Sequence, residues 1–79
     1  MKDRFRLTFP KERIAEPTMC LVARQFDVTF SIRRAEVRAD SGWMDLELKG
    51  SDEEIERVIQ YLQENGVRVD PVEGDIIAG

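Results

Sequence analysis

The sequence predicts an α+β fold in which two helices cover one face of a four-stranded antiparallel sheet. Four short segments alternate apolar and polar residues, as half-buried strands do. Two other segments carry apolar residues at the spacing of a helix with one buried face. The order along the chain is strand, helix, strand, strand, helix, strand. With 79 residues the chain forms one domain, and a domain this short gains stability from a partner subunit.

Composition and charge exclude several classes of function. Twelve basic residues against 16 acidic ones give a net charge of −4, which opposes nonspecific binding to nucleic acid or to anionic membranes. No apolar run approaches the length of about 20 residues that membrane insertion requires. The chain has one cysteine and no signal peptide, so we expect a cytoplasmic protein.

The first half begins with a strand over residues 4–9, which Pro10 ends. Residues 11–16 are expected to form a charged connector. A helix then begins at Pro17, since proline at the first helical position sacrifices no needed hydrogen bond, and it ends near Asp27. Its buried stripe has i, i+3, i+4, i+7 spacing and consists of Met19, Val22, Ala23 and Phe26.

The second strand, within residues 26–38, does not keep one alternation. Its first half places apolar side chains at even positions and its second half at odd positions. A strand changes faces in this way only through a bulge or a kink, because its side chains alternate with a period of two. Bulges are common beside functional sites, so this stretch is the first place to look for one. The apolar residues are Val28, Phe30 and Ile32, then Ala35 and Val37.

A turn over residues 39–42 makes the second and third strands a hairpin. In the third strand, Met44, Leu46 and Leu48 point to one face. The opposite face receives Trp43, Asp45, Glu47 and Lys49.

The second helix begins at Ser51, in a capping box where the Ser51 hydroxyl and the Glu54 carboxylate satisfy opposite backbone donors. Gly66 ends it. A short last strand contains Val67 and Val69 and is broken by Pro71. The buried stripe of this helix consists of Ile55, Val58, Ile59 and Leu62.

This order of elements is that of a ferredoxin-like βαββαβ sandwich, which leaves the other sheet face open or covered by a second subunit. With the first and third strands adjacent, Arg4 and Arg6 lie near Asp45 and Glu47. These side chains form either solvated ion pairs, each contributing roughly 0.2 to 1 kcal/mol, or part of a binding surface. Trp43 on the same face either belongs to such a surface or lies over the sheet rim.

Most enzymatic chemistry is excluded, and we expect neither a metal nor a cofactor. The chain has no histidine, which removes histidine-based acid–base schemes and most transition-metal sites. Cys20 has no partner cysteine and is expected to be a partly buried helix residue. The acidic run at 52–56 suits a helix N-terminus and needs no metal. No glycine-rich phosphate loop is present, and the open face lacks the aromatic residues of an RNA-binding sheet.

Residues 17–37, Gly50 and the ending 61–69 together resemble the NIL domain, and the resemblance extends over residues 3–73. We therefore expect one domain at 1–73 and a flexible tail at 74–79. NIL domains occur at the C-terminus of the ATPase subunit of bacterial methionine importers and beside iron–sulfur ferredoxin modules. The resemblance implies a ferredoxin-like regulatory domain that binds methionine and pairs with a second copy.

The family's Asn-Ile-Leu motif falls on Ser31-Ile32-Arg33, where only the isoleucine is kept. A serine hydroxyl can donate and accept as the motif asparagine does, with a shorter reach. Arg33 replaces the motif leucine and either adds a cation for an anionic ligand or simply faces water. By this resemblance the candidate ligand-binding residues are Thr29, Phe30, Ser31, Ile32 and Arg33.

Two functions follow as hypotheses. The first is a stand-alone sensor of methionine or another small amino acid, with its pocket between the second strand and a homodimer mate. The second is an interaction module that docks on a transporter, a ferredoxin or a sulfur-amino-acid enzyme and binds no small ligand. Since the second strand is an edge strand, self-association is expected in either case, unless Arg33, Arg34 and Arg38 protect that edge from pairing. The candidate interface residues are Trp43, Arg34 and Val37.

Overall fold

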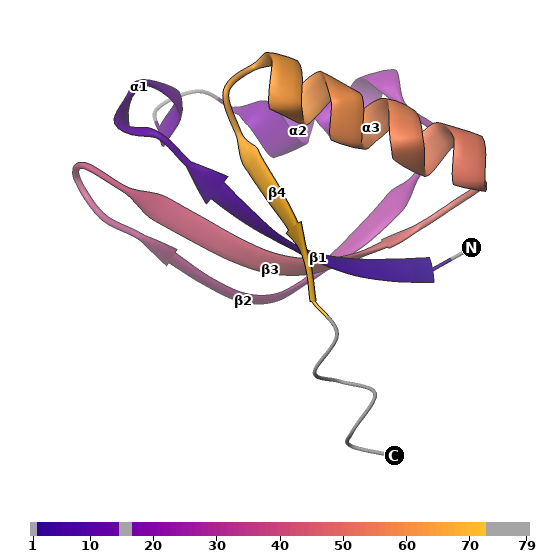
Figure 1. Ribbon diagram of the computed structural model, residues 1–79, viewed down its shortest axis with the longest axis horizontal. Coiled ribbons are helices and arrows are strands. Elements are labelled where there is room, and N and C mark those ends of the chain that lie inside the picture. Colours follow the sequence, from indigo (N-terminus) through magenta and orange to yellow (C-terminus); the bar gives the residue numbers. More distant parts are fainter. Residues whose placement is uncertain (1, 15–16, 73–79) are drawn as a thin grey trace.

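The computed structural model describes residues 2–14 and 17–72, and it has the predicted ferredoxin-like α+β architecture (Figure 1). Four strands form one antiparallel sheet in the order β2-β3-β1-β4. The helices α2 and α3 lie side by side on one face of this sheet. The elements are β1 Lys2–Phe9, α1 Lys11–Ile14, α2 Thr18–Gln25, β2 Thr29–Val37, β3 Gly42–Lys49, α3 Asp52–Glu64 and β4 Arg68–Pro71.

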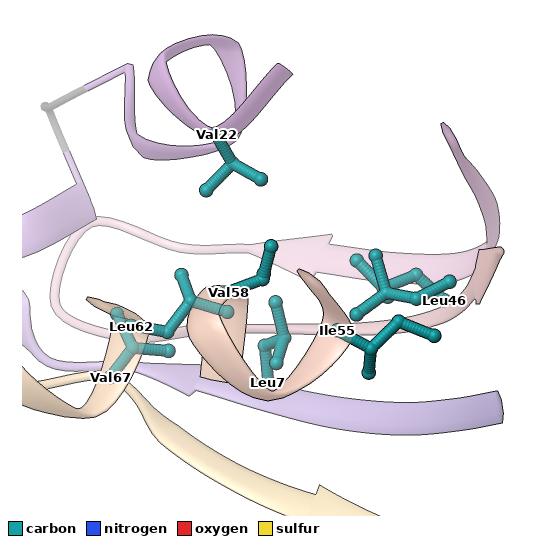
Figure 2. Packing of buried hydrophobic residues seen from close by; sticks show 8 residues of the cluster. Leu7, Val22, Leu46, Ile55, Val58, Leu62 and Val67 are labelled. Carbon is teal, nitrogen blue, oxygen red and sulfur yellow. The ribbon is translucent and has the colours of Figure 1, made fainter. Parts of the chain in front are cut away.

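Leucine and valine side chains from the sheet and from both longer helices meet in a single core between the two layers (Figure 2). Helix α3 contributes residues spaced at three and four positions, so one side of this helix faces the sheet. The predicted stripe of α3 is thus confirmed, with Ile59 half-buried beside it. The fully buried core residues are Leu7, Val22, Leu46, Leu48, Ile55, Val58, Leu62 and Val67.

Helix α2 differs in detail from the prediction. It begins at Thr18 and ends at Gln25, and its fully buried residues are Thr18 and Val22, one turn apart. Ala23, predicted to be buried, is exposed, and so is Cys20. Each residue advances about 100° around a helix, so a position two residues before Val22 lies on the far side from the core.

Three other expectations are corrected at the ends of elements. The predicted connector contains a single helical turn, α1, at Lys11–Ile14, while residues 15 and 16 lie outside the described part. Strand β2 begins at Thr29, one residue later than its apolar pattern suggests, because Val28 still belongs to the loop. Strand β4 runs from Arg68 to Pro71, so Val67 precedes it and Pro71 pairs with Phe5 at its end.

The N-terminus of α3 shows half of the predicted capping box. The Ser51 hydroxyl accepts a hydrogen bond from the Glu54 amide at 3.1 Å, as predicted. The Glu54 carboxylate does not return to Ser51; it accepts from the Asp27 amide at 2.9 Å and from Arg57 at 3.1 Å. Glu54 therefore ties α3 to the loop between α2 and β2.

The predicted change of face in β2 is confirmed as a β-bulge. Ile32 pairs with Leu46 and Arg34 pairs with Asp45, so Arg33 is the extra residue. Beyond it, Ala35 pairs with Met44 and returns the apolar row to the face that bears the helices. The predicted tail at 74–79 lies outside the described residues.

Candidate functional site

The open face of the sheet is organised around Asp45 in β3. Arg6 of β1 donates from Nε to Oδ1 at 2.6 Å and from Nη2 to Oδ2 at 2.9 Å, and Arg34 of β2 donates to Oδ2 at 3.0 Å. These three strands are neighbours, and directly paired residues point to the same face, which brings the three side chains together. Asp45 is only 7% exposed, although it lies on the face that no described helix covers.

The two arginines keep Asp45 ionised. Hydrogen bonds from Arg6, and to a lesser extent from Arg34, lower the pKa of Asp45 to about 2, against the opposing effect of its burial. Asp45 in turn raises the pKa of Arg6. The carboxylate thus remains a fixed negative charge across the physiological pH range.

Trp43 lies beside these three charged side chains, as expected from its place on the polar side of β3. The guanidinium carbon of Arg6 is 4.5 Å from the indole centroid, and that of Arg34 is 5.8 Å away. We refer to Arg6, Arg34, Trp43 and Asp45 as the Asp45 cluster. Two of the three predicted interface residues, Trp43 and Arg34, therefore meet in one place.

The third predicted interface residue, Val37, is separate from the Asp45 cluster. It pairs with Gly42 at the hairpin end of β2 and is 71% exposed. A smaller cavity of about 230 Å³ lies there, lined by Val37, Met44, Met19 and Cys20 among others. Ile32 lies earlier in the same strand and is 52% exposed. Both side chains mark an apolar row on β2 that the described helices leave uncovered.

The five predicted ligand-binding residues do not converge within one chain. Thr29 and Ser31 pair with Lys49 and Glu47, whose side chains lie on the open face. Phe30 and Ile32 pair with Leu48 and Leu46 and point toward the helices. Because alternate side chains of a strand face opposite ways, a single ligand could not contact both sets from one side of the sheet.

The fifth predicted ligand residue, Arg33, contributes to a larger cavity of about 460 Å³ on the open face. The bulge places Arg33 next to Arg34, and both line this cavity together with Arg4 and Asp45. The sequence indicated Arg4 and Asp45 either as members of cross-strand ion pairs or as part of a binding surface. The cavity that they share with Arg33 and Arg34 depends on the bulge register, which alternation alone does not determine.

The described residues contain neither a candidate metal site nor a candidate membrane-spanning helix. Residues 2–14 and 17–72 contain no group of three or more acidic, cysteine or histidine side chains that could hold a metal ion. Within the same part of the chain, no helix is long and apolar enough to cross a membrane.

These features define a small ferredoxin-like α+β domain with a charged sheet face that no described helix covers and an edge strand that carries exposed apolar side chains. The family model of the NIL domain matches residues 3–71, and the chain therefore belongs to the NIL domain family. A search of curated proteins found no match.

The fold is also shared with a solved structure, the C-terminal domain of an ABC transporter ATP-binding protein from Enterococcus faecalis. The TM-score is 0.77 at 20% sequence identity, and the similarity covers 89% of this chain and 82% of that one. At this identity the likeness shows a common fold.

Proposed function

We propose that this chain is a non-enzymatic, cytoplasmic regulatory domain that binds a small amino acid, methionine or a close relative, and acts on a transporter. Membership of the NIL family and the fold shared with a transporter ATP-binding protein's C-terminal domain support this assignment. The observation that carries it is the position of the candidate residues. They lie on β2, an edge strand that pairs only with β3 among the described elements.

The split of the candidate residues between two faces supports a pocket completed by a second copy. The hydroxyls of Thr29 and Ser31 are exposed, and they can donate to a carboxylate or accept from an ammonium. Ile32, on the other face, offers apolar surface to a thioether side chain. A second copy placed along the edge of β2 would supply, on each face of the sheet, the ligand contacts that a single chain lacks.

Thermal unfolding with each free amino acid at millimolar concentration tests this proposal. A ligand at 100 times its dissociation constant stabilises the folded state by about 2.7 kcal/mol, which raises the melting temperature measurably. We expect methionine or a close relative to do so, and Ser31→Ala or Thr29→Ala to abolish the shift. Thr8→Ala, an exposed threonine of β1, is the control and should retain it. Unchanged melting with every amino acid would rule out the sensor.

A second candidate is a docking module that binds a transporter subunit, a ferredoxin or an enzyme without any small ligand. The exposure of Ile32 and Val37 on one strand favours it, since large apolar side chains at a sheet edge are suited to a protein partner. Titration of the labelled chain with a purified transporter ATPase subunit or ferredoxin separates the two functions. Saturable binding that is weakened by Val37→Lys, with no amino-acid effect on melting, supports docking.

A further inference from the structure

The larger cavity on the open face is positively charged in an acidic protein. Its charged lining is three arginines and one aspartate, a formal sum of +2, and Glu47 beside it pairs with Arg4 at 3.5 Å, which lowers the sum to +1, whereas the whole chain carries −4. A concave surface of one sign concentrates ions of the opposite sign. The four charged residues are Arg4, Arg33, Arg34 and Asp45.

Asp45 does not neutralise this cavity. Its Oδ1 accepts from Arg6, and its Oδ2 accepts from both Arg6 and Arg34. The carboxylate is almost completely buried under these partners, so little of it faces the cavity. Arg34 itself has a side chain that is 69% exposed, which leaves further N–H groups of its guanidinium directed to solvent.

Arg33 adds a cation that none of the described residues engages. Within residues 2–14 and 17–72, its guanidinium makes no hydrogen bond or ion pair, and the residue is exposed. In a regular strand, Arg33 and Arg34 would face opposite sides of the sheet. The bulge lets both of them line one cavity.

The cavity floor is suited to a small polar ligand. Leu46 is 1% exposed and its side chain belongs to the core, so it presents main-chain atoms to the open face. Val72 borders the cavity and is fixed beside Arg4, because its amide donates to the Arg4 carbonyl at 3.0 Å. The volume of about 460 Å³ exceeds that of a single inorganic ion and leaves room for an attached organic group.

We propose that this cavity binds the phosphate group of a small phosphate monoester. A phosphate monoester carries about −1.5 to −2 charges at pH 7, and arginine forks bind its oxygens in pairs. A free amino acid is less suitable here, because its ammonium would face three guanidinium groups. The inference therefore does not depend on the amino-acid sensor proposed above, and the two ligands are assayed separately.

Trp43 provides the signal for a binding experiment with the intact chain. It is the only tryptophan, and its ring is in contact range of Arg34, which lines the cavity. Glycerol 3-phosphate and inorganic phosphate are titrated at constant ionic strength while indole fluorescence is recorded. We expect a saturable change with both anions, and no saturable change with succinate or with matched sodium chloride.

Two arginine-to-glutamine variants make the test specific for position. Arg33→Gln should weaken phosphate binding roughly tenfold or more, since it removes a charge-assisted contact. Arg24→Gln makes the same charge change on the exposed surface of α2 and should bind as the parent does. Both variants should melt at the parent temperature, because neither residue has a described partner. A linear response matched by chloride, equal binding of succinate, or equal losses in the two variants would overturn the proposal.

Discussion

Arg6 and Asp45 form a two-pronged hydrogen-bonded pair across neighbouring strands, with donor–acceptor distances of 2.6 and 2.9 Å. The pair joins β1 to β3 on the face opposite the core, and Arg34 extends it to β2. One carboxylate thus links three of the four strands. This arrangement makes the stability of the sheet depend on the charge of Asp45.

Asp45→Asn is expected to lower the free energy of unfolding by about 1 kcal/mol at neutral pH, since water screens the exposed arginines. The folded-state pKa of Asp45 is lowered from 3.8 to about 2, so its stabilising effect is fully present above about pH 4. The effect is lost as the pH falls through about 2. Urea unfolding of both proteins from neutral to acidic pH measures this, with Asp40→Asn in the exposed turn as the control. A difference between parent and variant that stays constant with pH would contradict it.

Glu54→Ala should release the loop between α2 and β2 from the start of α3. Its carboxylate accepts from the Asp27 amide at 2.9 Å, and we expect a loss of about 1 kcal/mol. Hydrogen exchange followed by NMR should show faster exchange of the Asp27 amide. Ser51→Ala should cost a similar amount through the lost helix cap but leave Asp27 protected. Glu53→Ala, at an exposed neighbouring position, is the control and should change neither property.

Gly66→Ala is expected to destabilise the protein by about 1 kcal/mol. Gly66 follows the end of α3 and has a φ of +83°. This left-handed conformation is unfavourable for a residue with a Cβ atom. The nearest atom to an added Cβ is Pro10 Cγ at 3.9 Å, so crowding is not the cause. Gly66→Asn should lose less, because asparagine tolerates this conformation better than alanine does. Equal melting temperatures for parent and alanine variant would refute the backbone explanation.

Ile32→Lys should reduce self-association without weakening the fold. Ile32 is 52% exposed on the edge strand, and a lysine there opposes pairing with a second edge. Light scattering over a range of concentrations should show the parent protein dimerising and the variant remaining monomeric. Gln60→Lys on the exposed side of α3 makes the same charge change and should dimerise as the parent does. A parent protein that is monomeric throughout would exclude a ligand pocket formed between two copies.

The sequence predicted the sheet and its order well because alternation is a direct consequence of one buried face. The shift of apolar residues in β2 even located the bulge, which the pairing of Ile32 and Arg34 confirms. The sequence did not predict α1, because a single helical turn at Lys11–Ile14 is too short to show helical periodicity. The link from Glu54 to Asp27 was also missed, because it depends on how a loop packs against a helix.

The candidate site was less predictable than the fold. Polar residues on the open face were expected to form either solvated ion pairs or part of a binding surface, and neither expectation indicated that Asp45 is buried. Its neighbours Arg6 and Arg34 extend over it and over the Trp43 ring, so long charged side chains provide the cover that a helix provides elsewhere. This cover depends on the order of the strands in the sheet and on their pairing register, to within one residue.

The bulge at Arg33 also determines which sequence changes β2 can accept. A deletion at this position would remove the extra residue and leave Ile32 opposite Leu46 and Arg34 opposite Asp45, so the last four residues of β2 would keep their faces. Substitutions at Arg33 leave that register in place, because the residue opposite is already paired with Arg34. The pairing of this strand therefore does not depend on its extra residue, and the identity of that residue is open to change. New ligand specificity could arise there without any remodelling of the sheet.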